Sequence, residues 1–228
     1  MRIKHFSIFK NNMETLEWED LRNDQSEKAY FLPYTKEEYL TKVNTNGPSF
    51  TTQQILKEIE EIGLKKIFSI GSGIASQEFE LKKFSDNIVT VSDYNSSILR
   101  LKQFDVFDDA LLIDAFKDPL PVDKNWVVLF PRIDTEFNDD QLTQLFNKCY
   151  ALGVNYICFI PAELLSIRII LAEIKIYLIS LIKSKPRVFC GYARSLSSFK
   201  KTWEPNYQIT KMFSKDKTII FLNKLPIN

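Results

Sequence analysis

Between residues 66 and 161, short apolar runs alternate with stretches that are apolar only at helical spacing. Such runs, each followed by glycine, proline or an acidic residue, are typical of buried parallel strands joined by amphipathic helices. They cover Ile67–Ile70, Ile88–Ser92, Ala110–Ile113, Asn125–Phe130 and Asn155–Ile160. Two later runs, Tyr207–Phe213 and Thr218–Leu225, flank a short polar segment and predict an antiparallel hairpin. The pattern predicts an α/β fold with a mostly parallel sheet.

The first strand-to-helix turn is Gly71-Ser72-Gly73. Glycine permits a sharp turn and a close approach of the backbone to a ligand, and the helix that follows offers unpaired N–H groups. This arrangement is typical of a nucleotide-binding βα unit. A tight turn without a ligand also favours glycine, so the motif alone leaves both interpretations open. Ser76 stands where a nicotinamide-binding fingerprint has its third glycine or alanine, which disfavours hydride transfer.

Acidic residues follow the second and third predicted strands. Asp93 closes Ile88–Ser92, about 20 residues after the glycine turn, where such folds place an acid that accepts both ribose hydroxyls. Asp114 closes Ala110–Ile113 in the same way. Because parallel strands end at one edge of a sheet, these acids are expected to lie close together. A helix cap or turn aspartate is the alternative for each.

The order GSG, VTVSD, LLIDA and NWVVLFP resembles a class I S-adenosylmethionine-dependent methyltransferase, from about Leu64 to the C-terminus. The resemblance implies a Rossmann-like α/β fold: a mostly parallel seven-stranded sheet, a C-terminal antiparallel hairpin and helices on both faces. It also implies S-adenosylmethionine as the cofactor. The glycine turn would lie against the methionine part, Asp93 would bind the ribose, and Asp114 with Ala115 would meet the adenine. The further cofactor candidates are Ser72, Tyr94 and Phe130.

One position departs from that family. Its members usually carry Asp or Glu two residues before the first glycine, where this chain has Ser69. A serine can donate a hydrogen bond but cannot balance the charge of the cofactor's ammonium group. Glu78 or Glu80, in the helix that follows the turn, could supply the charge. A solvated helix glutamate is the alternative for both.

We expect residues 1–62 to form an N-terminal helical extension or lid, with a short helix around 13–21 whose Met13, Leu16 and Trp18 cover an apolar surface. Residues 63–228 would form the cofactor-binding domain, with a helical insert at about 164–203. Tyr30 or Tyr34 could cover the cofactor, and ordinary packing is the alternative for both.

Leu164–Ile182 is apolar almost all round, interrupted by Arg168, Glu173 and Lys175. Three charges near the middle argue against a transmembrane span. Residues 164–187 could be a helix buried in the domain, a homodimer interface, or a helix on a membrane surface. Residues 190–203 resemble a segment of methyltransferases from bacterial surface-polysaccharide clusters, which implies polysaccharide biosynthesis and a glycan or glycolipid acceptor.

Charge is unevenly distributed although the net charge is only +1. Residues 164–228 carry 12 basic and 3 acidic side chains, which favours phosphate, anionic lipid or nucleic acid as a partner, with a solvated surface as the alternative. His5 is the one histidine, so we expect no histidine-based metal site. Three cysteines without CxxC spacing predict reduced thiols and a cytoplasmic protein, peripheral to the inner membrane face if the insert binds lipid.

Methyl transfer to a hydroxyl needs orientation and a general base. The candidate bases are carboxylates near the ends of the fourth and fifth strands: Asp134, Glu136 and Glu163. A capping or solvated acid is the alternative for each. Arg132, Tyr192 and Arg194 could hold a phosphate or sugar.

The sequence therefore predicts a methyltransferase acting on a small molecule, glycan or glycolipid. The alternatives are a non-catalytic module that binds a partner through residues 164–190, and an RNA methyltransferase. Nucleic acid is the less favoured partner, because no NPPY-like tetrapeptide is present.

Overall fold

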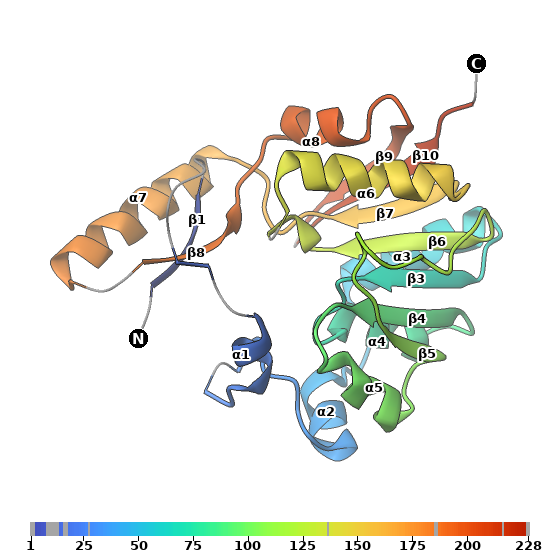
Figure 1. The fold of residues 1–228 in the computed structure, drawn as a ribbon, viewed down its shortest axis with the longest axis horizontal. Coiled ribbons are helices and arrows are strands. Elements are labelled where there is room, and N and C mark those ends of the chain that lie inside the picture. The colour runs from blue at the N-terminus through green and yellow to red at the C-terminus, as the bar shows by residue number, and fades with distance from the viewer. Residues whose placement is uncertain are drawn as a thin grey trace.

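The computed structural model describes residues 3–7, 14–15, 18–26, 28–135, 137–184, 187–215 and 217–226, without the side chains of residues 3–19 and 187–190. Most of these residues surround a seven-stranded sheet with the strand order β5-β4-β3-β6-β7-β10-β9 (Figure 1). Its strands are β3 (Lys66–Ile70), β4 (Ile88–Asp93), β5 (Asp109–Leu112), β6 (Trp126–Pro131), β7 (Tyr156–Ile160), β9 (Tyr207–Ser214) and β10 (Thr218–Lys224).

The first five strands of this sheet are parallel, as the apolar runs predicted. β3 pairs with β4 on one side and with β6 on the other, β5 pairs with the outer edge of β4, and β7 pairs with the outer edge of β6. β10 is antiparallel to both β7 and β9. The mostly parallel sheet and its C-terminal hairpin are thus confirmed. Because the parallel strands all end at one edge of the sheet, the turns after β3, β4, β6 and β7 lie together there.

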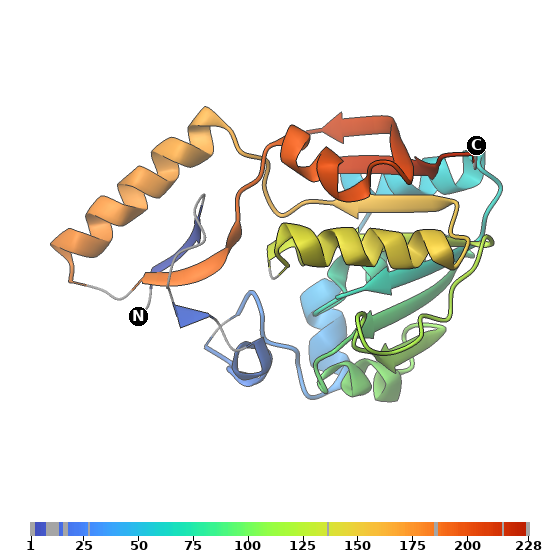
Figure 2. The ribbon, with the colours of Figure 1, turned by 45° about the horizontal axis from the view of Figure 1, so that its top comes forward.

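Helices cover both faces of the sheet (Figure 2). The helices of the described chain are α1 (Trp18–Asn23), α2 (Lys36–Val43), α3 (Phe50–Glu61), α4 (Ser76–Lys83), α5 (Ile98–Phe104), α6 (Asp139–Ala151), α7 (Ile167–Ile182) and α8 (Leu196–Trp203), with a 3₁₀ turn η1 (Ile133–Thr135). Those that pack on the sheet are α2 to α6 and α8. Successive side chains of β3 point to opposite faces of the sheet and enter two separate apolar cores. Ile67 packs with α2 to α5, whereas Phe68 packs with α6 and α8.

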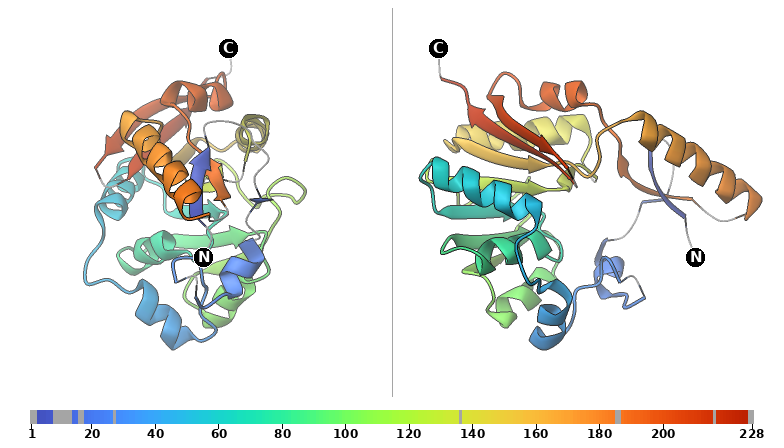
Figure 3. Two further views of the ribbon diagram at one scale, coloured as in Figure 1. Left: turned by 90° about the vertical axis from the view of Figure 1, so that its left-hand side faces the viewer. Right: turned by 180° about the vertical axis from the view of Figure 1, so that it is seen from behind.

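A side unit stands apart from the main sheet (Figure 3). It consists of α7 and a second sheet in which β8 (Arg187–Tyr192) lies between β1 (Ile3–Ser7) and β2 (Glu14–Thr15), all parallel. The start of the chain therefore pairs with the insert, which the sequence did not predict. Of the short helix expected around 13–21, α1 covers the part from Trp18, while Met13 and Leu16 lie outside the described residues.

The insert helix α7 is not buried in the domain, which makes that interpretation wrong. Its first and last residues, Ile167 and Ile182, are 77% and 82% exposed. Large apolar side chains between them are also exposed: Ile170, Leu171, Ile174, Tyr177, Leu178 and Leu181. Across the described ranges, no helix has the length and apolarity that crossing a bilayer requires.

Candidate functional site

The turn after β3 has a backbone that only glycine adopts easily. Gly71 and Gly73 have φ values of +70° and +59°. A Cβ at Gly71 would lie 2.7 Å from the Ile133 side chain, and one at Gly73 would collide with the Arg22 guanidinium. The turn is therefore enclosed by the loop after β6 and by the N-terminal segment.

Ser72 ties this turn to the end of β4. Its N–H donates to the Ser92 carbonyl over 3.0 Å, and its hydroxyl oxygen accepts from the Ser92 N–H. The Ser92 hydroxyl in turn donates to the Ser69 carbonyl over 2.7 Å. These bonds hold the ends of β3 and β4 in register, and Ser72 remains at the lining of a cavity.

Glu78 lies beside Ser69 in the interior. The Ser69 hydroxyl donates to Glu78 Oε1 over 2.5 Å, and both residues are buried. Burial raises the pKa of Glu78 to about 7, the Ser69 hydrogen bond and the charge of Lys217 oppose the rise, and Asp93 adds to it. The solvated alternative is wrong for Glu78.

Glu80 points elsewhere. It accepts hydrogen bonds from the Ser49 N–H and from the Thr52 hydroxyl, and so joins α4 to the start of α3. Of the two glutamates considered from the sequence, Glu78 alone lines the cavity at the glycine turn.

Asp93 is buried at the end of β4 and holds the turn from the opposite side. Its Oδ2 accepts from the Gly73 N–H over 2.8 Å, and its Oδ1 accepts from the Asn95 N–H over 2.9 Å. A carboxylate oxygen can accept two hydrogen bonds, so each keeps capacity for a ligand. Asp93 and the half-exposed Tyr94 both line the cavity.

We call this space the glycine-loop cavity; it measures about 240 Å³. Its other walls are Arg22, Ala29, Tyr30, Ile74, Ser76, Gln77, Pro131, Arg132, Ile133, Thr135, Phe137, Ile160 and Lys217. Tyr30 therefore reaches the cavity. Tyr34 does not line it and lies against the Arg100 guanidinium, 4.6 Å from its ring centre.

Four predicted cofactor residues do not line the cavity: Ser69, which is buried behind Glu78, and Asp114, Ala115 and Phe130. Phe130 is fully buried in the core against Phe146, because its position in β6 faces α6. Ala115 is buried in the same core. Asp114 accepts from the Phe116 N–H and forms a 2.8 Å ion pair with Lys117, which holds its pKa below the ordinary value.

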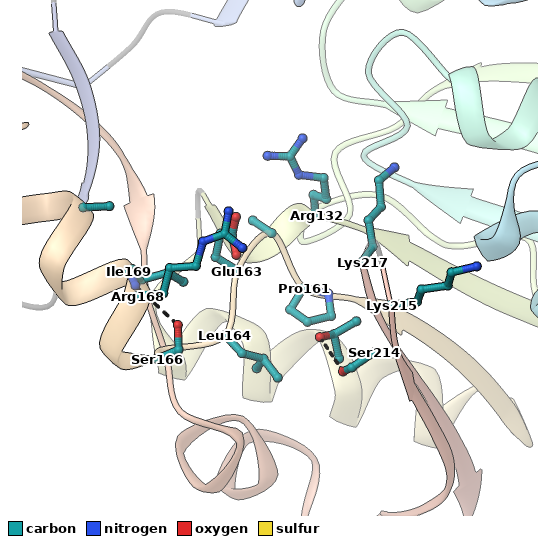
Figure 4. A pocket seen from close by; sticks show the side chains of 13 residues that line it. Arg132, Pro161, Glu163, Leu164, Ser166, Arg168, Ile169, Ser214, Lys215 and Lys217 are labelled. Carbon is teal, nitrogen blue, oxygen red and sulfur yellow. Dashed lines mark hydrogen bonds between the residues drawn. The ribbon is translucent and has the colours of Figure 1, made fainter.

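A second cavity of about 650 Å³ adjoins the first, and we call it the basic cavity (Figure 4). It lies where the loop after β7 and the start of α7 meet the β9–β10 turn. Its lining is Arg132, Pro161, Ala162, Glu163, Leu164, Ser166, Arg168, Ile169, Ala172, Ser214, Lys215, Lys217 and Thr218. Arg132 and Lys217 line both cavities, so the two spaces meet between these side chains.

Arg132 stands in a left-handed conformation, with φ +62°. This costs energy for a residue with a Cβ, and such residues cluster at functional sites. A hydrogen bond from its N–H to the Ile160 carbonyl, 2.8 Å long, fixes the strained turn to the end of β7. In this conformation the Arg132 side chain lines both cavities.

The three candidate bases fall in different places. Asp134 is fully buried and lines neither cavity; its Oδ1 accepts from the Ala162 N–H over 2.9 Å. Its Oδ2 has no hydrogen-bond partner among the described residues, and burial raises the pKa of Asp134 to about 6. Glu163 is exposed and lines the basic cavity. Glu136 lies outside the described residues.

Arg194 and Gly191 hold the loop after β6 rather than binding a ligand directly. The Arg194 guanidinium donates to Asp139 over 2.7 Å and to the Asp134 carbonyl over 2.8 Å. A Cβ at Gly191 would lie 2.7 Å from Thr135 Cα. Of the residues suggested from the sequence for phosphate or sugar, Arg132 lines both cavities, whereas Arg194 lines neither. Lys215 was suggested only as an RNA-binding lysine, and Arg22 and Lys217 were not suggested for any ligand. The pair of lysines in the hairpin turn was the available signal.

No family model matches the sequence, and no curated protein matches it. Solved structures do match. Human N-acetylserotonin methyltransferase in complex with SAM aligns over 90% of this chain and 57% of its own, at 18% identity and a TM-score of 0.57. Magnesium protoporphyrin IX methyltransferase from Synechocystis PCC 6803, with bound SAH, aligns over 87% and 97%, at 11% identity and the same TM-score.

A third neighbour, mitomycin 7-O-methyltransferase, aligns over 72% of this chain and 50% of its own, at 14% identity and a TM-score of 0.57. The chain has the class I methyltransferase fold. At these identities the likeness establishes the fold alone. The chain spans about half the length of several of these neighbours, including the human and the mitomycin enzymes.

Proposed function

We propose that the protein is an S-adenosylmethionine-dependent methyltransferase that methylates a hydroxyl group of a small molecule. The observation that carries this is the glycine-loop cavity. Its turn, Asp93 and Glu78 come together at the carboxyl edge of the sheet, where open α/β folds bind ligands. Structural neighbours bound to SAM and SAH support the choice of cofactor.

The residues present fit this cofactor. Asp93 keeps acceptor capacity for the ribose hydroxyls, and the glycine turn leaves room for the methionine part. Glu78, held by Ser69, supplies the negative charge that the serine itself lacks, and Lys217 can meet the carboxylate. Tyr94 flanks the ribose position. Asp114 and Ala115 remain proposed neighbours of the adenine, and Phe130 is withdrawn because it is fully buried.

The bound cofactor would supply the methyl group on a sulfonium, for an in-line transfer to the acceptor oxygen. The chain's contribution is to orient the acceptor where the cavities meet, between Arg132 and Lys217. Glu163 is the proposed base that receives the hydroxyl proton, since it alone of the two described candidates lines a cavity. Asp134 is a positioning residue that holds the loop after β7.

Residues 1–62 were expected to form a lid on the domain of residues 63–228, and we propose that role for the part before α2, since α2 and α3 pack in the core of the sheet. Tyr30 and Arg22 line the cavity from this segment. The neighbours' names support a small-molecule acceptor; a glycan or glycolipid and the polysaccharide-cluster subtype have no support among them.

A titration of S-adenosylmethionine by calorimetry tests the proposal. We expect micromolar binding by the wild type and at least about a hundredfold loss in Asp93→Ala, because two charge-assisted hydrogen bonds to the ribose disappear. Asp123→Ala, an exposed aspartate away from both cavities, is the matched control and should bind normally. Absence of binding by the wild type at millimolar cofactor would rule the enzyme out.

We further propose that the exposed apolar side of α7 binds a second copy of the chain and forms a homodimer. Ile167, Ile170, Leu171, Ile174, Tyr177, Leu178 and Leu181 form this stripe. Their spacing is symmetric about Ile174, so the stripe matches itself under a twofold rotation. A membrane-surface helix usually carries a polar face rich in Lys and Arg, whereas the only charged residues of α7 are Arg168, Glu173 and Lys175.

Light scattering of the wild type and of Leu171→Ser/Leu178→Ser tests this contact. We expect a dimer that becomes a monomer in the double variant, with Leu152→Ser, an exposed leucine after α6, as the unchanged control. A wild-type monomer that binds anionic vesicles would instead favour the membrane surface. A cytoplasmic location remains a proposal that rests on the cysteine usage.

A further inference from the structure

Four cationic side chains from three separate segments line the basic cavity. Arg132 comes from the loop after β6, Arg168 from the first turn of α7, and Lys215 and Lys217 from the β9–β10 turn (Figure 4). Among the described residues of the lining, Glu163 is the one carboxylate. Ser166, Ser214 and Thr218 add hydroxyl groups. The cavity is therefore strongly positive and polar.

These cations have carboxylates near them but, among the described residues, no close ion pair: the charge of Lys217 acts on Glu78 and Glu80, and that of Arg132 acts on Asp134. Within the described part of the chain, none of the four forms an ion pair within 4.0 Å. All four are exposed, whereas two half-buried lysines do form such pairs: Lys211 with Glu58 at 2.6 Å and Lys82 with Asp108 at 2.7 Å. Lys215 instead lies 5.0 Å from the centre of the Phe50 ring. Their charges have the same sign, so the potential in the cavity favours entry of an anion, most strongly at low salt.

We infer that the basic cavity binds a phosphate monoester carried by the methyl acceptor. A doubly charged phosphate matches several cations better than a single carboxylate does, and arginine presents its donors in a fork that fits phosphate oxygens. Arg168 and Lys215 line the basic cavity from opposite sides and do not line the glycine-loop cavity, so the proposed phosphate would lie between them (Figure 4). Arg132 and Lys217 mark the end next to the glycine-loop cavity, where the hydroxyl to be methylated lies. The inference rests on the proposed function for the identity of the acceptor, though not for binding of the phosphate.

Calorimetric titration of glycerol 3-phosphate, without cofactor, tests the site on the full chain. The variant is Arg168→Gln/Lys215→Gln, which removes two cations that do not line the glycine-loop cavity. The matched control is Lys200→Gln/Lys201→Gln, which removes two exposed lysines of α8. We expect the first variant to lose at least about tenfold in phosphate affinity, the control to lose less than about twofold, and both to bind S-adenosylmethionine as the wild type does.

Further titrations distinguish a soluble phosphate from a lipid phosphate, and test the phosphate site separately from the proposed methyltransferase function. Binding of phosphatidic acid vesicles but not of glycerol 3-phosphate, with the same loss in Arg168→Gln/Lys215→Gln, would keep the phosphate site and make the acceptor a lipid. Equal binding by the variant and the wild type, or tighter binding of a short single-stranded RNA, would overturn the inference. A wild type that binds glycerol 3-phosphate but not S-adenosylmethionine would sink the proposed function and leave the phosphate site standing.

Discussion

The main sheet and the side unit use apolar residues in opposite ways. The sheet buries them on both faces, so that Phe68, Phe130 and Phe146 are inaccessible to water. α7 packs one side near β1 and leaves a stripe of large apolar side chains exposed. A buried apolar face stabilises the monomer, whereas an exposed one marks a surface for contact. The difference teaches that similar hydrophobicity is buried for folding in one region and left exposed in the other, where we propose that it serves association.

The largest effect that would sharpen this comparison comes from Phe146→Ala. The Phe146 ring lies 5.3 Å from Phe130 and 5.5 Å from Trp203, measured between ring centres. Removing it leaves a cavity between β6 and α8, and we expect the free energy of unfolding to fall by about 3–5 kcal/mol in urea denaturation. A loss below about 1 kcal/mol would mean that this core is not packed as described.

A gain in stability is expected from Glu78→Gln at high pH. The folded-state pKa of about 7 exceeds the ordinary 4.5, so wild-type stability falls as pH rises from about 4.5 to 7. The amide keeps an acceptor for Ser69 without the buried charge, and the variant should be more stable than the wild type by about 3 kcal/mol at pH 8. At pH 4.5 the difference should be near zero. Urea denaturation at both pH values checks this; a pH-independent difference would contradict it.

Gly191→Ala tests the junction between the side unit and the loop after β6. Gly191 has φ +126°, and an added Cβ would lie 2.7 Å from the Thr135 backbone. We expect a loss of about 1–3 kcal/mol and weaker cofactor binding, because Thr135 lines the glycine-loop cavity. Gly47→Ala, with nothing within 4 Å of the added Cβ, is the control. Equal melting temperatures for the two variants would show that the junction is not tight.

The smallest effect on monomer stability is expected from Leu171→Ser/Leu178→Ser. Both side chains are at least half-exposed, so each substitution should change the free energy of unfolding by less than about 0.5 kcal/mol at concentrations where the chain is monomeric. Dilute urea denaturation measures it. A loss as large as that of Phe146→Ala would show that the stripe belongs to a core and would erase the contrast between the two regions.

The sequence predicted the main sheet well because its strands are continuous apolar runs with turn residues after each. It did not predict the sheet of the side unit. β1 has only five residues, includes Lys4 and His5, and pairs with β8 from the far end of the chain. Neither local periodicity nor turn chemistry signals such a distant pairing.

Site residues divide in the same way. The glycine turn and Asp93 line one cavity because strand ends converge by topology. Glu78 lies in the first turn of the helix that follows the glycine turn, so the sequence could suggest that it replaces the acid missing at Ser69. The burial of Glu78 could not be predicted. The left-handed backbone of Arg132 could not be predicted, because glycine and asparagine are the residues that usually signal this conformation. The basic cavity depends on how α7 meets the hairpin turn, which is a tertiary feature.

The central claim is that Glu78 replaces the acid missing at Ser69 in binding the cofactor's ammonium group. Calorimetry with S-adenosylmethionine at pH 6 and pH 8 tests it most directly. Because the pKa of Glu78 lies near 7, wild-type affinity should rise about tenfold over this range. Glu78→Gln should bind weakly at both pH values, and Ser69→Asp/Glu78→Gln should recover binding. Equal, pH-independent affinity of the wild type and Glu78→Gln would contradict the account.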